Sequence, residues 1–351
     1  MNTFFSVLIL FSFLALFIYL MLKIVTKTMG TSPSANLPVY NDTPSVEANA
    51  EFNKIRSSQG SGLRNCGDNK ALISQTLRNL VIKSSYNTAF TGSYMNLNMI
   101  EHVLSRGCRF LDFQVFVKDN IVVVGYSNAT YDPSFTSMTS LNCLSLKGVC
   151  QTIMSYAFSD TSPNKNDPLF VQFHLKTSKT THYDTVAEVL NTMKEKLALN
   201  TSTNLPITVS PDTRLSDIMG KVVILMDAPL ISTYTPSTNT QANLSQVVNM
   251  YTGTPTVPIY MESELMNQMY TPSSDTSYLF RIVQPTLGFF MGVTNPNAPI
   301  LIQYYSVQII GQAFYVMDTN LKAYEQLFKD SQSAFLTMSD TIGKISKSKS
   351  V

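Results

Sequence analysis

The sequence predicts an α/β protein made of parallel βα units, with one transmembrane helix at its N-terminus. Two observations support this prediction. An unbroken apolar run extends from Phe4 to Leu22, and from about Leu72 onward short strand-like runs alternate with helical patterns. A chain of 351 residues, of which 44% are hydrophobic, is also large enough to bury a substantial core.

The apolar run from Phe4 to Leu22 contains no charged residue, proline or glycine. At about 1.5 Å per residue, a helix of this length crosses a hydrocarbon core of about 30 Å. A cleaved signal peptide is the competing interpretation, but it requires a positive charge before a shorter apolar core. Here the charges, Lys23 and Lys27, follow the run instead. Because such flanking charges tend to stay in the cytosol, residues 1–27 are expected to form a single-pass membrane anchor with the C-terminal domain on the cytosolic side.

Residues 28–69 are expected to form a flexible linker. The stretch is rich in Ser, Asn and Thr, and Pro33, Pro38 and Pro44 discourage helix formation. At the other end of the chain, residues 336–351 are expected to form a polar and basic tail. A solvated tail explains its lysines better than a lipid or partner contact does.

The central part of the chain alternates between strand and helix patterns. Strands are predicted over Leu80–Ile82, Phe110–Phe116, Ile121–Val124, Leu169–Phe173 and Lys221–Met226. Helices are predicted over Ile100–Arg106, Cys150–Phe158, Tyr183–Leu197 and Leu215–Met219, with Gly107 ending the first of them. This order of strands and helices indicates a parallel sheet.

The C-terminal third is less regular. A stretch rich in Thr, Pro, Ser and Asn, from Ile231 to about Pro258, is predicted to be a long loop or insertion. Beyond it, strands are predicted over Leu279–Val283 and Ser306–Ile310, and a last helix over Leu321–Phe328.

Composition excludes some classes of function. The formal net charge of +2 is too small to indicate nucleic-acid binding. The four cysteines lack the Cys-x-x-Cys spacing of metal sites, although Cys143 and Cys150 could form a local disulfide in an oxidising compartment. Four Asn-x-Ser/Thr sites occur, at Asn41, Asn128, Asn200 and Asn243. They would be glycosylated only if the domain were lumenal.

Several separated segments follow one another in an order that is typical of one family. They are Ser84-Ser85-Tyr86-Asn87-Thr88, Arg106-Gly107-Cys108-Arg109 followed by Asp112, Val123-Val124-Gly125-Tyr126-Ser127, Gly220-Lys221-Val222-Val223-Ile224-Leu225, and Arg281-Ile282-Val283-Gln284-Pro285. Together they resemble the catalytic domain of phosphatidylinositol-specific phospholipase C, over roughly residues 70 to 330. The resemblance implies that residues 70–335 form a distorted (β/α)8 barrel of TIM type, with function at the C-terminal ends of its strands.

The resemblance also implies that the chemistry of the family is lost. In that family the first segment reads Ser-Ser-His-Asn-Thr, and two histidines act as general base and general acid. At the two positions this chain has Tyr86 and Val124. A tyrosine, with a pKa near 10, is a poor base at pH 7, and a valine transfers no proton. A catalytically degenerate domain, or pseudoenzyme, is therefore expected.

The calcium site of the eukaryotic members is altered as well. The resemblance leaves Asn87 and Asp112 as residual ligands, while Gln114 replaces one carboxylate and His174 falls at the position of another. Calcium binds six to eight oxygen ligands, several of them anionic. The residual site is therefore expected to be non-functional, and no cofactor is expected.

Two further residues are candidates for a role in the site. Arg281 matches an arginine that the family uses on the inositol phosphate, which makes it the candidate substrate-binding residue. His174 could act with Asp112 as a relocated acid/base pair, so that Tyr86, Asp112 and His174 are the candidate catalytic positions. Alternatively, the imidazole of His174 fills and hydrogen-bonds the space where the family holds its metal.

The first hypothesis for the function is a membrane-anchored, phospholipase-C-like domain that no longer catalyses and has a binding or structural role at a membrane surface. Its partners would be the membrane, through the Phe4–Leu22 helix, and a phosphoinositide head group or a protein. No nucleic-acid partner is expected.

Two other hypotheses compete with it. One is an active phosphoric diester hydrolase, acting on a phosphoinositide or a related phosphodiester, with a rearranged site at His174, Asp112 and Arg281. The other is a scaffold or receptor-binding ectodomain, glycosylated at Asn128 or Asn243.

Overall fold

The computed structural model describes residues 39–56, 61–128, 137–177, 179, 181–227, 243–267, 279–288 and 292–348. From Pro38 onward the chain forms one compact unit. The predicted membrane anchor, Phe4 to Leu22, lies outside the described residues. Among the residues that are described, no helix is both long enough and apolar enough to cross a bilayer.

The strands are β1 (Val39–Tyr40), β2 (Leu80–Ile82), β3 (Phe110–Lys118), β4 (Ile121–Gly125), β5 (Asn142–Ser145), β6 (Leu169–Lys176), β7 (Val222–Asp227), β8 (Met250–Thr252), β9 (Ile259–Met261), β10 (Ile282–Gln284), β11 (Leu287–Gly288), β12 (Gly292–Val293), β13 (Ile309–Ile310) and β14 (Phe335–Thr337). The α-helices are α2 (Val46–Ile55), α3 (Lys70–Ile73), α4 (Leu97–Ser105), α5 (Leu146–Ala157), α6 (Thr181–Leu190), α8 (Glu262–Asn267), α9 (Ala298–Tyr305), α10 (Thr319–Ser331) and α11 (Met338–Ser348). Short 3-10 helices cover Cys66–Asp68, Leu77–Asn79, Asn191–Met193, Leu215–Ile218 and Leu244–Gln246.

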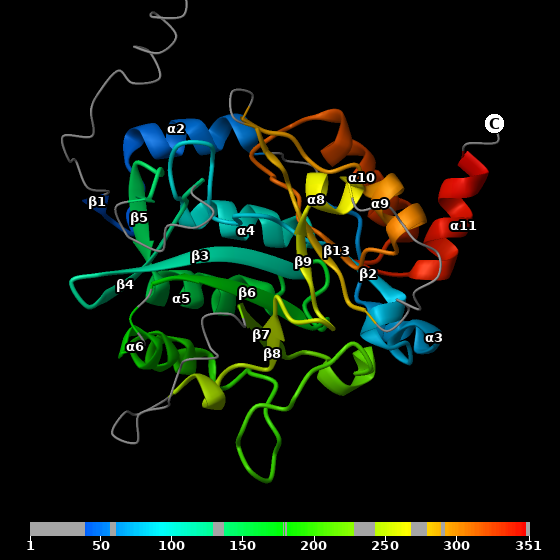
Figure 1. Ribbon diagram of the computed structural model, residues 1–351, viewed down its shortest axis with the longest axis horizontal. Coiled ribbons are helices and arrows are strands. Elements are labelled where there is room, and N and C mark those ends of the chain that lie inside the picture. Colours follow the sequence, from blue (N-terminus) through cyan, green and yellow to red (C-terminus); the bar gives the residue numbers. More distant parts are fainter. Residues whose placement is uncertain are drawn as a thin grey trace, which may run out of the picture. The chain divides into compact units, whose positions relative to one another are not determined.

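Two sheets carry the fold (Figure 1). In the seven-stranded sheet the order is β1-β5-β4-β3-β6-β7-β8, and in the five-stranded sheet it is β14-β2-β13-β10-β9. Strands β3, β6, β7 and β8 are parallel to one another, and so are β2, β13, β10 and β9. Helix α5 contacts α4 on one side and α6 on the other, whereas α9 contacts α10 and α11 near the C-terminus. The predicted α/β class with parallel βα units is confirmed.

The two sheets do not join into one closed barrel, so the prediction of a (β/α)8 barrel over residues 70–335 is wrong in this respect. Strand β2 is only three residues long, and it is the segment after it that meets β3, through an isolated bridge between Ser84 and Phe110. The later part of β3, from Gln114 to Lys118, bonds to the antiparallel strand β4 instead. At the other junction, no strand ladder joins β8 to β9 within the described ranges. Only the start of β3 bonds to the segment after β2, through the carbonyl oxygens of Phe110 and Asp112, because its later backbone groups are used in the hairpin with β4.

The outward faces of the central strands form the larger part of the core. Phe113 of β3 and Phe173 of β6 are fully buried, and their rings stack with centroids 5.8 Å apart. Ile224 of β7 continues the same apolar layer beneath the helices. Each such buried side chain contributes about 1.5–3 kcal/mol of hydrophobic stabilisation. This layer fixes the backbone that carries the inward-facing side chains.

Local sequence signals set the ends of α4. Asn96 precedes the helix, and its side-chain oxygen accepts a hydrogen bond from the amide of Asn98. The helix ends just before Gly107, which has a φ of +80° and whose Cβ, if present, would clash with the side chain of Leu63. The predicted helix end at Gly107 is confirmed.

Other predicted elements agree less well. The helix predicted over Tyr183–Leu197 ends at Leu190 and continues only as a short 3-10 turn. The loop predicted from Ile231 to about Pro258 is wrong in its described part, because Met250–Thr252 forms β8 and pairs with β7. A three-residue segment forms a strand because it pairs with a neighbouring strand, so its own sequence does not predict it.

The linker predicted over residues 28–69 is wrong where the structure describes it. Val39 and Tyr40 form β1, which pairs with β5. Helix α2 begins after Ser45, whose side chain accepts a hydrogen bond from the amide of Ala48, and it buries Phe52 in the main core. Tertiary packing therefore orders this segment in spite of its proline-rich composition.

The tail predicted over residues 336–351 is likewise wrong in its described part. Residues Phe335–Thr337 form β14, which pairs with β2 in antiparallel fashion, and Met338–Ser348 form α11. All four cysteines are buried, and Cys143 and Cys150 form no disulfide with each other.

Candidate functional site

The inward faces of three neighbouring parallel strands change from apolar to polar along their length. Near the N-terminal ends, Phe110, Phe170 and Val223 lie in register and are buried. Because side chains on one face of a strand are two residues apart, the same face then carries polar residues. They are Asp112 and Gln114 in β3, Gln172 and His174 in β6, and Asp227 in β7. A polar site therefore forms at the C-terminal ends of the strands.

His174 lies between two carboxylates. Its Nδ1 atom is 2.9 Å from both Oδ1 and Oδ2 of Asp227, and its Nε2 atom is 2.8 Å from Oδ2 of Asp112. A carboxylate oxygen accepts hydrogen bonds, so a ring nitrogen that bonds to one must carry a hydrogen. With a carboxylate at each nitrogen, the arrangement favours the doubly protonated, cationic ring.

The carboxylates also set the pKa of His174. Burial is the largest single influence and lowers this pKa, but the charges and hydrogen bonds of Asp227 and Asp112 outweigh it and raise the pKa to about 10. At neutral pH the ring therefore holds both protons and has no lone pair with which to act as a general base. With a pKa so far above 7, it is also a poorly matched general acid.

Asp112 is the most buried acid of the cluster, with 2% of its surface exposed. Its Oδ1 atom accepts a hydrogen bond of 3.1 Å from the backbone amide of Asn87. Its Oδ2 atom bonds to His174 and also accepts from the side-chain amide of Gln284, at 3.3 Å. The Nε2 atom of Gln284 lies 3.0 Å from Nε2 of His174. A buried carboxylate is tolerated because its oxygens are bonded in this way.

Asp227 is the more accessible acid, with 22% of its side chain exposed. Its Oδ1 atom accepts hydrogen bonds from Nε2 of Gln172, at 3.1 Å, and from Oγ1 of Thr252, at 3.3 Å. Thr252 ends β8, so four consecutive strands, β3, β6, β7 and β8, contribute to the cluster. The exposed edge of Asp227 is where the cluster can meet a ligand.

Tyr86 and Asn87 reach the cluster from the segment after β2. Asn87 has a φ of +44°, a conformation that asparagine tolerates, and this turn directs its amide toward Asp112. Its own side-chain amide is buried and has no hydrogen-bond partner among the described residues. Tyr86 is 4% exposed, and burial, reinforced by the charge of Asp112, raises its pKa well above 10. Tyr86 is therefore a neutral phenol at pH 7 and no base.

Three aromatic rings form a wall beside these groups. Phe90 stacks on Tyr126 with centroids 4.3 Å apart and meets Tyr315 edge to face at 4.9 Å. Burial, with smaller effects from Tyr126, Tyr86 and Asp112, raises the pKa of Tyr315 well above its ordinary value. The hydroxyl of Tyr315 is buried and has no hydrogen-bond partner among the described residues. It is thus a second unpaired polar group near Asp112.

The donor set does not fit calcium. The side chain of Gln114 is already used, because it accepts from the amide of Ser127 at 2.9 Å and donates to its carbonyl oxygen at 3.2 Å. His174 fills the space between the two acids, and Asn87 and Asp112 alone supply too few oxygens for a calcium ion. Within the part of the chain that the structure describes, no three His, Cys, Asp or Glu side chains are arranged to hold a metal.

Arg281 is not brought together with the other predicted site residues. It precedes β10, whereas Gln284, which contacts His174, ends that strand. The Nη1 atom of Arg281 donates to the carbonyl oxygen of Tyr305 at 3.0 Å, at the end of α9. At about 3.3 Å per residue, Arg281 and Gln284 are roughly 10 Å apart along the strand. Arg281 thus lies away from the cluster around His174, and its assignment as the substrate-binding residue stays a prediction.

Several members of the cluster are absent from the sequence-based set of site residues, among them Asp227 and Gln284, which both contact the pair of His174 and Asp112. Asp227 is the last residue of β7 and Gln284 is the last residue of β10, so their position at strand ends is the signal that could have found them. The family pattern drew attention to Arg281 instead, three residues before Gln284.

Residues 73–227 match the family model described as phosphatidylinositol-specific phospholipase C, X domain. Residues 73–227 therefore form a region of the phosphatidylinositol-specific phospholipase C superfamily. The part that matches the X domain of this superfamily includes Tyr86, Asn87, Asp112, His174 and Asp227, while Gln284 lies beyond it. The resemblance seen in the sequence segments is therefore confirmed at the level of the superfamily.

Solved structures show the same fold. The chain is similar to the crystal structures of L. pealei PLC21, with a TM-score of 0.58, and S. officinalis PLC21, with a TM-score of 0.59. Each is 16% identical, and the match covers 80% of this chain but 39% of the solved chain. This chain therefore spans well under half of the length of either structure. No curated protein matches the sequence.

Proposed function

We propose that this protein binds a phosphoinositide head group at a membrane surface, through the cluster around His174, and does not hydrolyse it. The observation that carries the proposal is the position of His174, with both ring nitrogens bonded to carboxylates. Such a ring has no lone pair for a general base, yet it holds three strands in place around polar groups that face inward. The superfamily of phosphatidylinositol-specific phospholipases supplies the class of ligand.

The absence of hydrolysis is supported by the residues at the two expected proton-transfer positions. Tyr86 is a buried phenol whose pKa is raised above 10. Val124 lies within β4, fully buried and in register with Val115. Neither side chain can move a proton at pH 7, and each such transfer is typically worth about 10² to 10⁴ in rate. The domain is accordingly proposed to be a degenerate phospholipase C.

Ligand binding is supported by polar groups that lack a partner. The side-chain amide of Asn87 and the hydroxyl of Tyr315 are buried without hydrogen bonds among the described residues. An unpaired buried polar group costs free energy, of the order of 1–3 kcal/mol. A ligand hydroxyl or phosphate oxygen that pairs with these groups would recover that cost. Asp227, the most exposed member of the cluster, offers an acceptor for a ring hydroxyl.

Two further features complete the proposal. Binding is proposed to need no calcium, which is supported by the scarcity of free oxygen ligands around Asp112. The segment Phe4 to Leu22 is proposed to anchor the protein in a membrane with its domain on the cytosolic side, which rests on the length of the apolar run and on Lys23 and Lys27.

Two measurements on the full-length chain in detergent test the proposal. Isothermal titration calorimetry with inositol 1-phosphate measures head-group binding, with myo-inositol and inorganic phosphate as separate ligands for comparison. Hydrolysis of phosphatidylinositol in mixed micelles, with calcium or with EGTA, measures catalysis. Saturable binding of inositol 1-phosphate and no turnover above a protein-free blank are expected. Failure of inositol 1-phosphate to bind would overturn the proposal.

The rival function, an active phosphodiesterase that uses His174 and Asp112, is tested by the same turnover assay. His174→Ala is compared with the matched control His182→Ala, which removes a histidine that bonds to Thr177 and lies outside the cluster. Turnover that is lost in His174→Ala and kept in His182→Ala would establish the rival. The distance of 2.8 Å between His174 and Asp112 is the observation in its favour.

A further inference from the structure

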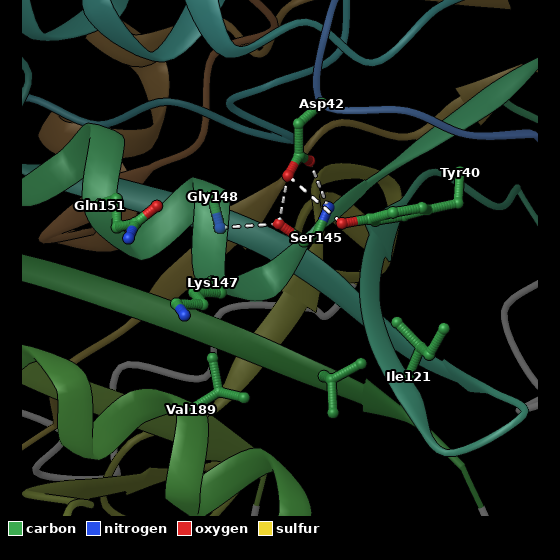
Figure 2. Close-up of a pocket in the computed structure, with 9 residues that line it drawn as sticks. Tyr40, Asp42, Ile121, Ser145, Lys147, Gly148, Gln151 and Val189 are labelled. Atoms are coloured by element: carbon green, nitrogen blue, oxygen red, sulfur yellow. Dashed lines mark hydrogen bonds between the residues drawn. The ribbon is translucent and has the colours of Figure 1, made fainter.

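Residues 39–55, which we call the N-terminal strap, lie outside the matched region 73–227 but belong to the same compact unit. The strap is fixed at its start by the pairing of β1 with β5. Asp42 then accepts hydrogen bonds from the amide of Ser145, at 2.7 Å, and from its hydroxyl, at 2.6 Å (Figure 2). The Ser145 hydroxyl in turn accepts from the amide of Gly148, so Asp42 holds the residue that caps α5.

The same strap forms one side of a surface pocket. Tyr40 and Asp42 line a space of about 440 Å³ together with Lys147 and Gln151 of α5 (Figure 2). The hydroxyl of Tyr40 lies 3.4 Å from Asp42. Asp42 therefore ties the start of the strap to the N-terminus of α5, and helix α2 follows it.

Glu51, on α2, connects the strap to the segment between β2 and α4. Its Oε1 atom accepts a hydrogen bond of 2.7 Å from the amide of Ser93 and another of 2.7 Å from the hydroxyl of Thr91. Gly92 lies between these two donors with a φ of +123°, and a Cβ on it would lie 3.2 Å from the same Oε1 atom. The turn at Gly92 thus fits directly against the carboxylate of Glu51.

This segment, residues 86–96, is the one that carries Tyr86 and Asn87 into the candidate site. Its far end is also held by the strap, because the side-chain amide of Asn96 donates to the carbonyl oxygen of Ala48 at 3.3 Å. Between the two ends, Phe90 stacks on Tyr126 in the aromatic wall. The segment is therefore held by Asp112 at its start, and by the strap together with Asn142 of β5, which bonds to Met95, at its middle and end.

We propose that Glu51 is a positioning residue of the candidate site: its two hydrogen bonds to the turn at Gly92 hold residues 86–96 so that Asn87 meets Asp112 and faces the ligand. The expected effect of Glu51 on head-group affinity rests on the function proposed above. The effect on Asn87 is independent of any ligand. Glu51 acts through the backbone of the segment and touches neither Asp112 nor His174 in the hydrogen bonds of the described residues.

Residue-resolved hydrogen exchange and titration with inositol 1-phosphate, both on the full-length chain, test this role. Glu51→Ala should speed exchange of the Ser93 and Asn87 amides by at least about tenfold, because bonds to a charged acceptor are lost. It should also weaken inositol 1-phosphate binding by roughly tenfold. Glu51→Gln keeps an acceptor oxygen and should restore most of both properties. The matched control is Glu47→Ala, which removes an exposed acid from the first turn of the same helix.

The outcomes separate this proposal from the proposed function. Faster exchange at Ser93 with an unchanged Asn87 amide would overturn it, whether or not a ligand binds, because Glu51 would then support only its own turn. The same effect from Glu47→Ala would also overturn it, because α2 as a whole would then be responsible. Faster exchange at both amides in a protein that binds no inositol 1-phosphate would uphold the positioning role and reject the proposed ligand.

Discussion

The Nδ1 atom of His174 lies 2.9 Å from each carboxylate oxygen of Asp227. Because the opposite nitrogen of the ring is 2.8 Å from Asp112, one imidazole links β7 to β3 across β6. Two acids that face each other across a strand would repel, and a cation between them removes that repulsion. The protonated ring thereby compensates the charges of both carboxylates.

Replacing His174 with alanine should destabilise the protein by about 3 kcal/mol or more, because Asp112 and Asp227 lose the partner that compensates them. Urea unfolding at pH 7, followed by circular dichroism, measures the change. His182→Ala is the control and should stay within about 0.5 kcal/mol of wild type, as partly exposed substitutions usually do. Equal losses in the two variants would contradict the compensating role of His174.

Stability should also depend on pH through His174. Its pKa in the folded protein is about 10, above the ordinary value of 6.5. The stabilisation from its second proton is therefore fully present below about pH 6.5 and is lost as the pH rises toward 10. The free energy of unfolding of wild type, measured relative to His174→Gln, should fall by up to about 1.4 kcal/mol per pH unit in this window. A difference that stays constant from pH 6 to 9.5 would show that the ring is neutral.

A carboxylate in place of the imidazole should convert the cluster into a cation site. His174→Glu would put a third acid beside Asp112 and Asp227, with the side-chain oxygen of Asn87 still unpaired. Millimolar calcium should then raise the thermal unfolding temperature of this variant and leave that of wild type unchanged. His174→Gln serves as the control, since it adds no charge. Stabilisation of wild type by calcium would mean that the native cluster already binds the metal.

Much of the strand framework could be predicted from the sequence. Strands β3, β6 and β7 are short aromatic and β-branched runs bounded by turns, and the sequence places all three. Asp112 and His174 could then be assigned to the same site, because the family resemblance places both at positions of the calcium site. The family resemblance added the order of the segments, which periodicity alone does not give.

The contacts between strands could not be predicted. The sequence shows Asp227 as an acid at a strand end, but its bond to His174 depends on the register of β6 and β7. Arg281 matched a family position, yet it lies at the opposite end of β10 from the cluster, since the site is built from Gln284. The N-terminal strap could not be predicted for the same reason. Its composition is that of a linker, and the hydrogen bonds of Glu51 are made to residues 40 or more positions away in the sequence.

Gln284 and Arg281 should behave differently in ligand binding. Gln284→Ala removes the amide that bonds to Asp112, and it should weaken inositol 1-phosphate binding about fivefold or more. Arg281→Gln loses the bond to the carbonyl of Tyr305, and it should lower stability by about 1–2 kcal/mol while leaving the affinity unchanged. Calorimetric titration of both variants, with urea unfolding as the check on stability, tests the pair. The reverse pattern would restore Arg281 as the head-group residue.

Removal of the N-terminal strap should unfold or strongly weaken the domain, whereas removal of the segment before it should not. A chain that starts at Val39 keeps β1, α2 and the bonds of Asp42 and Glu51, so its unfolding free energy should remain close to that of the full chain. A chain that starts at residue 57 loses Phe52 from the core and should be less stable by about 3 kcal/mol or more. Urea unfolding of the two fragments measures the difference.

Phe52→Ala in the longer fragment separates the packing of that ring from the hydrogen bonds of Asp42 and Glu51, because only the packing is lost. Equal stability of the two fragments would show that α2 contributes nothing to the core and would return residues 39–56 to the role of a linker.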